Sequence, residues 1–142
     1  MAQTKVEIRT VHGATAAVGW SNGRTVTIDR ATSTGSLGIG FNGGELLLFA
    51  VGGCYCNDLF REAEKLGISI NNVNIQVETD WGGDPVRATN LRFSVRVESD
   101  DPREKVEDLI RLTDRVAEIP NSLRFGTEAT LAKFEVVSRR KD

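Results

Sequence analysis

Residues 42–67 read NGGELLLFAVGGCYCNDLFREAEKLG, and this stretch decides the fold. Asn42, with Glu45 three residues later, has the form of a capping box, in which each side chain accepts a hydrogen bond from the other residue's backbone N–H. Gly67 is a typical C-terminal stop for a helix. Between these caps, apolar residues first cover every face and then recur three or four positions apart. The stretch is therefore predicted to form one long helix that enters the protein interior and leaves it again.

The predicted helix is longer than one small domain covers easily. At about 1.5 Å per residue it spans roughly 35 Å, so a second copy of the chain is expected to help bury it. Both cysteines, Cys54 and Cys56, lie at its midpoint directly after Gly52 and Gly53. Each glycine weakens a helix by about 1 kcal/mol. Glycines at this point indicate close packing, or the approach of another group to the backbone.

Composition excludes several classes of protein. The chain has 142 residues, 39% of them hydrophobic and 27% charged, with a net charge of -2. These values fit one domain over residues 1–142 and leave no basic surface for nucleic acid or a membrane. No run reaches the roughly eighteen apolar residues of a transmembrane helix, so a cytoplasmic protein is expected.

The cysteine count points to reduced thiols. Two cysteines and one histidine are too few for a usual metal site, so no metal and no cofactor are expected. Residues i and i+2 of a helix point to different sides, which argues against a disulfide between Cys54 and Cys56. Free thiols in a reducing compartment are the better interpretation.

The segment before the helix predicts strands. Residues 5–29 alternate between apolar and polar, and Asn22-Gly23 is a typical two-residue hairpin turn. Residues 1–41 are therefore expected to form an antiparallel meander that ends in a Thr-, Ser- and Gly-rich loop, Ala31 to Phe41.

The segment after the helix predicts strands and a second helix within residues 42–142. Two alternating runs between residues 73 and 97 indicate a hairpin connected through Trp81 to Pro85. A helix is expected from Asp101, as its N-cap, to just before Pro120, followed by a turn over residues 121–125. A last strand is expected from Ala129 to Val137. This order indicates an α+β protein with helices packed on antiparallel sheets.

The run ELLLFAVGGC, residues 45–54, resembles the signature of the OsmC/Ohr family, the osmotically inducible protein C and organic hydroperoxide resistance proteins. Residues 65–68 and 73–77 resemble that family's helix exit and next strand. Residues 118–123 look like the place where many members read C-P-x-S. The resemblance implies an OsmC-like fold: antiparallel sheets packed around a long central helix, in an intertwined homodimer with active sites at the subunit interface.

The resemblance also implies a reaction. In catalytic members a cysteine on the long helix attacks a peroxide and becomes a sulfenic acid, a second cysteine forms a disulfide with it, and a dithiol restores both. An arginine lowers the pKa of the attacking thiol, and a carboxylate orients that arginine. The attacking residue here is Cys54, and Glu45 is the candidate carboxylate. The arginine belongs to the N-terminal region, where Arg24 and Arg30 are candidates.

Three positions depart from the family pattern. Ile119 stands where C-P-x-S has its cysteine, Gly43 replaces an entry proline, and Gly44 falls where hydroperoxide reductases carry the arginine-orienting glutamate. Glu45 follows one residue later. A shift of one residue turns a helical side chain by about 100°, so a capping role for Glu45 is favoured over an arginine-orienting role.

Two functions stay open from the sequence. The first is a thiol-dependent peroxidase that reduces organic hydroperoxides through Cys54, with a small or protein dithiol as the external reductant because Ile119 carries no thiol. The second is a non-catalytic dimeric module that binds a small apolar or thiol ligand. Cys56 lies about 200° around the helix from Cys54 and is expected to pair with nothing. Arg61 is interpreted as a surface charge beside Asp58 or Lys65.

Overall fold

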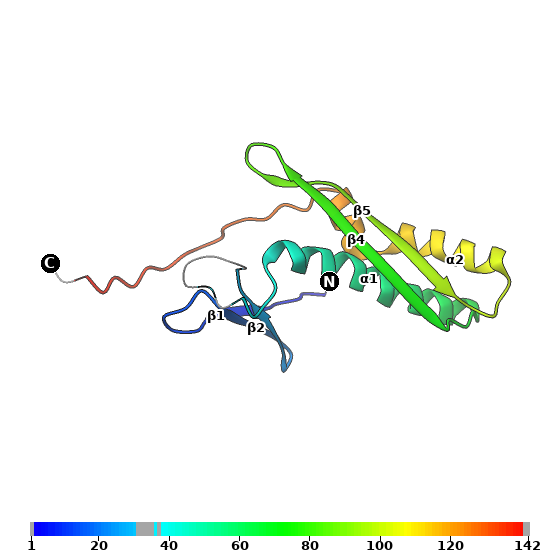
Figure 1. Ribbon diagram of the computed structural model, residues 1–142, viewed down its shortest axis with the longest axis horizontal. Coiled ribbons are helices and arrows are strands. Elements are labelled where there is room, and N and C mark those ends of the chain that lie inside the picture. The colour runs from blue at the N-terminus through cyan, green and yellow to red at the C-terminus, as the bar shows by residue number, and fades with distance from the viewer. Residues whose placement is uncertain (1, 31–35, 37, 141–142) are drawn as a thin grey trace.

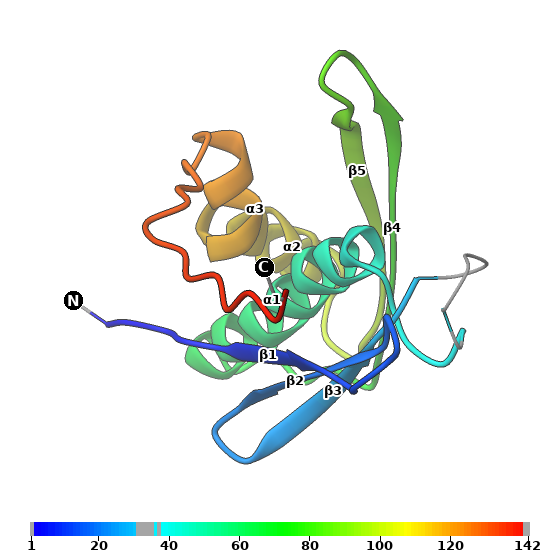
Figure 2. The ribbon, with the colours of Figure 1, turned by 90° about the vertical axis from the view of Figure 1, so that its left-hand side faces the viewer.

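The computed structural model describes residues 2–30, 36 and 38–140. The elements within these residues are β1 (Glu7–Thr10), β2 (Ala17–Ser21), β3 (Arg24–Ile28), α1 (Gly43–Leu66), β4 (Asn72–Gly82), β5 (Arg87–Glu98), α2 (Arg103–Val116) and α3 (Glu118–Arg124). Strands β1, β2 and β3 form one antiparallel sheet, and β4 and β5 form another (Figure 1). Seen along α1, the first sheet lies below the helix, the β4–β5 hairpin lies on one side, and α2 and α3 lie on the other (Figure 2). The predicted α+β class is confirmed.

Helix α1 is the long helix predicted from residues 42–67. Asn42 Oδ1 accepts the Glu45 N–H at 2.8 Å, and Glu45 Oε1 accepts the Asn42 N–H at 3.0 Å, so the capping box is confirmed. Gly67 ends the helix with a φ of 68°, a left-handed conformation that glycine adopts readily. A Cβ added to Gly52 would lie 3.0 Å from Val77 Cγ2 of β4. The first of the two mid-helix glycines therefore permits close packing of α1 on the sheet.

Both predicted hairpins form. Asn22 and Gly23 join β2 to β3 with positive φ values of 48° and 77°, as a two-residue turn of this kind requires. Strands β4 and β5 pair antiparallel, and their connection is shorter than predicted because Trp81 and Gly82 still pair with β5.

The predicted loop 31–41 is described in part, because residues 31–35 and 37 lie outside the described residues. Its last residue, Phe41, forms a parallel bridge with Ile28. The Phe41 N–H donates to the Thr27 carbonyl at 3.1 Å, and the Phe41 carbonyl accepts the Asp29 N–H at 3.1 Å. The chain is therefore tied to β3 directly before α1 begins.

The prediction for the second helix is wrong in two places. Pro102 is the N-cap of α2 and makes no side-chain hydrogen bond, whereas the Asp101 carboxylate accepts the Ser69 N–H at 2.7 Å. Asp101 thus ties the start of α2 to the chain that leaves α1. The turn predicted for residues 121–125 is largely helix, because α3 holds Pro120 in its first turn. Proline is tolerated there since first-turn N–H groups have no partner within the helix.

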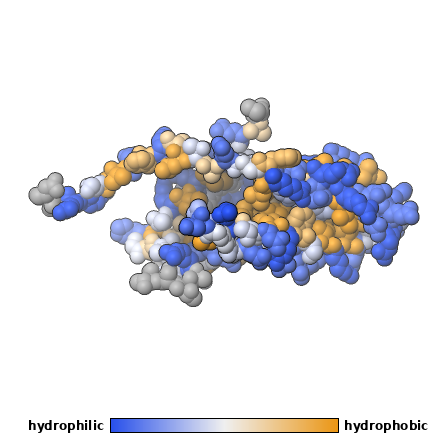
Figure 3. All heavy atoms as spheres, turned by 90° about the horizontal axis from the view of Figure 1, so that it is seen from above, coloured by the Kyte–Doolittle hydropathy of each residue, from blue (hydrophilic) through white to orange (hydrophobic). Residues whose placement is uncertain are grey.

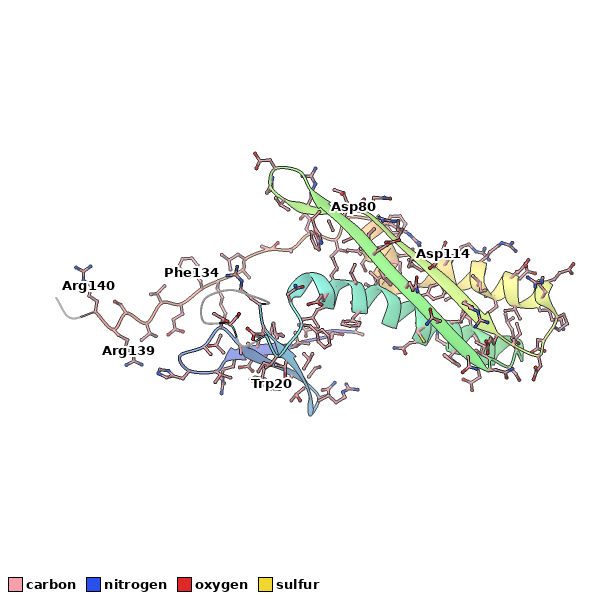
Figure 4. All side chains as sticks on the ribbon, in the orientation of Figure 1. Trp20, Asp80, Asp114, Phe134, Arg139 and Arg140 are labelled. Carbon is pink, nitrogen blue, oxygen red and sulfur yellow. The ribbon has the colours of Figure 1, made fainter. Side chains whose placement is uncertain are left out.

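The last predicted strand, Ala129 to Val137, does not form. Residues 127–140 have no regular secondary structure and extend away from the β4–β5 hairpin (Figure 1). The alternation is present, but a strand needs a neighbouring strand, and no described strand pairs with this segment. Its apolar side chains are exposed, with Leu131 and Phe134 both at 80%. Figure 3 shows hydrophobic side chains along this C-terminal arm (residues 127–140), and Figure 4 shows Phe134 projecting from it.

The core lies where α1 meets the hairpin and the other helices. Its buried apolar residues are Tyr55, Leu59, Ala63, Leu109 and Ala117. The Tyr55 hydroxyl donates to the Ile110 carbonyl at 2.9 Å. Burial, together with the negative charge of Asp114, raises the pKa of Tyr55 to about 12. In the described part of the chain, no helix is long and apolar enough to cross a membrane.

Candidate functional site

Cys54 lies at the middle of α1, where the helix meets α3. Its Sγ accepts the backbone N–H of Ile119 at 3.4 Å and lies 3.6 Å from Oδ2 of Asp58, one turn further along α1. The side chain is partly exposed. Both cysteines, Cys54 and Cys56, are free thiols, as predicted. The Cys54 sulfur therefore contacts an N–H donor from one helix and a carboxylate from another turn of its own helix.

Asp58 also links this thiol to the charged side chains of Arg61 and Glu118. Its side chain is 9% exposed, and its Oδ1 lies 3.2 Å from Nη1 of Arg61, which confirms the predicted pairing of these two residues. The same nitrogen lies 3.4 Å from Oε1 of Glu118 at the start of α3. The Arg61 guanidinium therefore bridges α1 and α3 and compensates the buried charge of Asp58.

These surroundings raise the pKa of the Cys54 thiol above its ordinary value. Burial is the largest cause, and the negative charge of Asp58 acts in the same direction. The N–H groups of Ile119 and Glu118 act in the opposite direction, because they stabilise negative charge on the sulfur. At neutral pH the sulfur of the single chain therefore keeps its proton, and the S–H donates to Asp58.

The other predicted site residues lie away from the sulfur. Glu45 is engaged in the capping box at the start of α1, whereas Cys54 lies at its middle. Arg24 begins β3 and lines a cavity of the meander, and the Arg30 backbone N–H donates to Asp29 at 2.8 Å. Among the described residues, neither guanidinium forms an ion pair or hydrogen bond with Cys54. The charged group that acts on this thiol is Asp58.

Sequence reasoning missed Asp58 as a neighbour of Cys54. Residues four apart share one face of a helix, so the spacing C-x-x-x-D is a usable signal. The contact with Ile119 is harder to predict, because it depends on where the chain breaks between α2 and α3. Only the likeness of residues 118–123 to C-P-x-S pointed toward it.

Two cavities bear on ligand binding. One of about 220 Å³ lies between α1, β5 and α3 and is lined by Val51, Leu91, Phe93, Pro120, Leu123 and Arg124. Cys54 does not line this cavity, but two lining residues are near it in sequence: Val51 is one turn before Cys54 on α1, and Pro120 follows Ile119. A second cavity of about 320 Å³ lies against the meander and has a mostly apolar lining that includes Val6, Ile8, Trp20, Val26, Ile28 and Leu46. Over residues 2–30, 36 and 38–140, no group of three His, Cys, Asp or Glu side chains is placed to hold a metal ion.

The arrangement suits nucleophilic thiol chemistry. A thiolate is a strong nucleophile, and it forms here only if the proton of Cys54 has somewhere to go. The carboxylate of Asp58 lies at that proton, and the Ile119 N–H stabilises the negative sulfur that remains. The mostly apolar cavity between α1, β5 and α3, which Val51 and Pro120 line, provides room for the organic part of a substrate.

Known proteins share this sequence pattern and fold. The sequence model of the OsmC-like protein family matches residues 33–132, more than half of the chain. The sequence itself matches none of the curated proteins. An OsmC-like protein from Mycoplasma pneumoniae is similar in structure, with a TM-score of 0.71, 15% identity and 89% of each chain covered.

Two hydroperoxide resistance proteins are similar in structure as well. The organic hydroperoxide resistance protein OsmC from Legionella pneumophila has a TM-score of 0.62 and 14% identity, over 87% of this chain and 90% of that chain. OhrB from Bacillus subtilis has a TM-score of 0.62 and 18% identity, over 88% of this chain and 93% of that chain. At these identities the likeness shows the fold, and the predicted OsmC-like α+β fold with antiparallel sheets is confirmed.

Proposed function

The chain belongs to the OsmC-like protein family, and on that premise we propose that it is a thiol-dependent peroxidase that reduces organic hydroperoxides through Cys54. The observation that carries the proposal is the setting of the Cys54 sulfur. It is partly exposed, accepts the Ile119 N–H, and lies 3.6 Å from a carboxylate. The hydroperoxide resistance proteins from Legionella pneumophila and Bacillus subtilis, which share the fold, support the substrate class.

The proposed reaction has one oxidative and two reductive steps. The Cys54 sulfur attacks the terminal oxygen of a hydroperoxide, ROOH, so that an S–O bond forms, the O–O bond breaks and an alcohol leaves. A thiol then displaces water from the sulfenic acid and leaves a mixed disulfide. A second thiol group attacks that disulfide, restores the Cys54 thiol and carries away the oxidised reductant.

The reductant is proposed to come from outside the chain. Residue 119 contacts the Cys54 sulfur through its backbone, but its side chain is an isoleucine and has no thiol to offer. Cys56 is the one other cysteine of the chain and is a free thiol. It stands two residues along an unbroken helix and so points away from Cys54. A small dithiol or a dithiol protein therefore resolves the sulfenic acid.

The proposed active form is a homodimer, and the first argument is the exposed face of α1. Phe49 is 57% exposed and Phe60 is 49% exposed, and Ala50 and Gly53 lie between them on the outward side of the helix. An apolar stripe of this kind on a helix usually faces another element. A second α1 fits this stripe, because the small residues at its middle let two helices approach closely.

The second argument for a dimer is the C-terminal arm. Leu131, Phe134 and Val136 are 77–80% exposed on an extended segment that passes beyond the hairpin of its own chain. Such a segment has strand-forming alternation, and none of the described strands pairs with it. In an intertwined dimer it pairs with the second copy. The same arrangement brings a second N-terminal region near each thiol, and Arg24 and Arg30 stay the candidates for an activating arginine.

A binding module is the second candidate function. The raised pKa of Cys54 favours it, because a protonated thiol is a poor nucleophile. The apolar cavity against the meander, about 320 Å³, is of a size that accepts a small ligand. In this case Cys54 has a structural role. For both candidate functions, the role of Glu45 in orienting an arginine is still only a prediction.

The test is hydroperoxide consumption by the purified protein with dithiothreitol as reductant. Cumene hydroperoxide loss is expected to be catalytic for the wild type and for Cys56→Ser, and to fall to the background rate for Cys54→Ser. Cys56→Ser is the matched control, since it removes a free thiol from the same helix. Loss of peroxide at the background rate with all three proteins would remove the peroxidase and leave the binding module.

A further inference from the structure

We propose that Asp58 is a catalytic residue that accepts the proton of the Cys54 thiol during attack on the peroxide and returns it to the departing alkoxide. The inference rests on the proposed peroxidase function and deepens it. It gives a buried carboxylate the task of activating the thiol. The resemblance gives that task to an arginine beside the sulfur.

The geometry of the pair is that of a thiol and its proton acceptor. Asp58 Oδ2 lies 3.6 Å from Cys54 Sγ, within hydrogen-bond distance for the larger sulfur atom. The two residues are four positions apart on α1, so the helix itself fixes the contact. The Ile119 N–H also reaches Sγ, at 3.4 Å, and stabilises the negative charge that the sulfur acquires when the proton leaves.

The charges around Asp58 hold it ready to accept a proton. On α1 it faces Cys54 and the Arg61 guanidinium, which lies 3.2 Å from the other carboxylate oxygen. From α3, Glu118 reaches the same guanidinium at 3.4 Å. Glu62 also lies near it, 3.6 Å from Arg61 Nε. Arg61 is shared among three carboxylates, so it orients Asp58 without neutralising it fully, and Oδ2 is left to the thiol.

The proposed transfer balances. The sulfur forms a bond to the terminal peroxide oxygen, and that oxygen keeps its own hydrogen and becomes the hydroxyl of the sulfenic acid. The O–O bond breaks and its electron pair leaves with the alkoxide. The thiol proton moves to Asp58 Oδ2 as the S–O bond forms, and then to the alkoxide, which becomes the alcohol. The sulfur is oxidised, the peroxide is reduced, and Asp58 ends each turnover as it began.

A carboxylate beside a thiol has two opposite effects, and these give the proposal its test. Its negative charge disfavours the free thiolate, so removing the charge speeds any reaction that needs only a thiolate. Its oxygen accepts a proton, so removing it slows a reaction in which proton transfer accompanies attack. Alkylation by iodoacetamide belongs to the first kind, and turnover of a hydroperoxide belongs to the second.

The experiment compares Asp58→Asn with the wild type in both reactions, in a Cys56→Ser background. Iodoacetamide is expected to alkylate Cys54 faster at neutral pH in Asp58→Asn, with the pH profile shifted to lower pH. Turnover of cumene hydroperoxide with dithiothreitol is expected to fall roughly 100-fold at neutral pH. It should recover in part at alkaline pH, where the thiolate forms without an acceptor. Glu64→Gln is the control, since it neutralises an exposed carboxylate of α1 that takes no part in the Arg61 contacts, and it should change neither rate.

Faster turnover in Asp58→Asn, in step with faster alkylation, would overturn the proposal and show that Asp58 only restrains the thiol. Circular dichroism establishes whether the variant is folded. If it is not, Asp58→Glu replaces it, since it keeps the acceptor, and its turnover should stay within about tenfold of the wild type. A larger loss in folded Asp58→Glu would also overturn the proposal. If the wild type shows no turnover, the proposed peroxidase function itself is refuted. The Asp58 variants test only the role of Asp58.

Discussion

Cys54 and Tyr55 are neighbours on α1 whose pKa values both rise, because the fold buries each group near a carboxylate. Asp58 acts on the thiol and Asp114 acts on the phenol. For Tyr55 the raised pKa bears on stability, because its buried hydroxyl donates a hydrogen bond to the Ile110 carbonyl. For Cys54 it sets the central chemical problem of the site, since the proton must leave before the sulfur can react.

Tyr55→Phe tests this interpretation of the core. The variant loses the 2.9 Å hydrogen bond to the Ile110 carbonyl and should be less stable by about 1 kcal/mol at neutral pH. A raised pKa means that the fold favours the neutral phenol. The stabilisation is thus complete below the ordinary pKa of about 10 and declines as pH rises toward about 12. Urea unfolding at about pH 7 and about pH 11 should show a smaller alkaline loss in Tyr55→Phe, and an equal loss in both proteins would refute this account.

Ile119→Cys tests the position of residue 119 against the sulfur. Its backbone N–H lies 3.4 Å from Cys54 Sγ, so a thiol introduced there should lie close enough to attack a sulfenic acid on Cys54. Hydroperoxide treatment should then give an intramolecular disulfide, seen as a loss of free thiols in a Cys56→Ser background. The introduction of a cysteine at the exposed Leu123 is the control, and disulfide formation there but not at residue 119 would contradict the placement.

At the scale of elements, the local signals were sufficient for α1 and both hairpins. The capping box, Gly67 and the Asn22-Gly23 turn each act through hydrogen bonds or backbone angles of nearby residues, so their effect can be predicted without the rest of the chain. Helix α3 was missed because Pro120 was treated as a stop, whereas it fits the first turn of a new helix. The role of Asp101 was missed because its partner, Ser69, is distant in sequence.

The two mid-helix glycines are expected to differ. A Cβ at position 52 would lie 3.0 Å from Val77 Cγ2, so Gly52→Ala should lose about 1 kcal/mol, as overpacking outweighs the gain in helix propensity. A Cβ at position 53 meets no described atom of the chain within 4 Å, so Gly53→Ala should leave packing on β4 unchanged. Because Gly53 lies on the face of α1 that a second copy is proposed to cover, the added methyl group should weaken association between copies. Unfolding and sedimentation measured at several protein concentrations separate these effects, and equal behaviour of the two variants would argue against the proposed helix contact.

At the scale of the whole molecule, the sequence pattern and the single-chain structure disagree at the C-terminal arm. The pattern predicts a strand, and the structure has no regular secondary structure there. The alternation of residues 129–137 is that of a strand, but hydrogen-bonded pairing requires a neighbouring edge, and no described strand pairs with this segment. The same reasoning applies to the site. Cys54 could be predicted from its motif, and Asp58 lies four residues further along the same helix, whereas Ile119 becomes a neighbour of Cys54 only through the placement of α3 against α1.

Phe134→Asp tests whether a second copy covers the arm. Phe134 is 80% exposed in the single chain, so a charge there should cost nothing if the arm stays in solvent. In the proposed dimer the substitution buries an unpaired charge and should convert dimer to monomer in sedimentation equilibrium. Lys133→Gln, next to it on the arm, changes the net charge by the same one unit and is the control. A wild type that is monomeric at all concentrations would contradict the proposal.

The most direct test of the account is to identify the product of one oxidation. The reduced Cys56→Ser protein is mixed with one equivalent of cumene hydroperoxide in the presence of dimedone, which traps sulfenic acids, and the peptide that carries Cys54 is analysed by mass spectrometry. The account predicts near-stoichiometric dimedone adduct on Cys54, and its loss in the Asp58→Asn variant at neutral pH. An unmodified Cys54 in the folded wild-type site would contradict it, because a thiol that hydroperoxide does not oxidise cannot begin the proposed reaction.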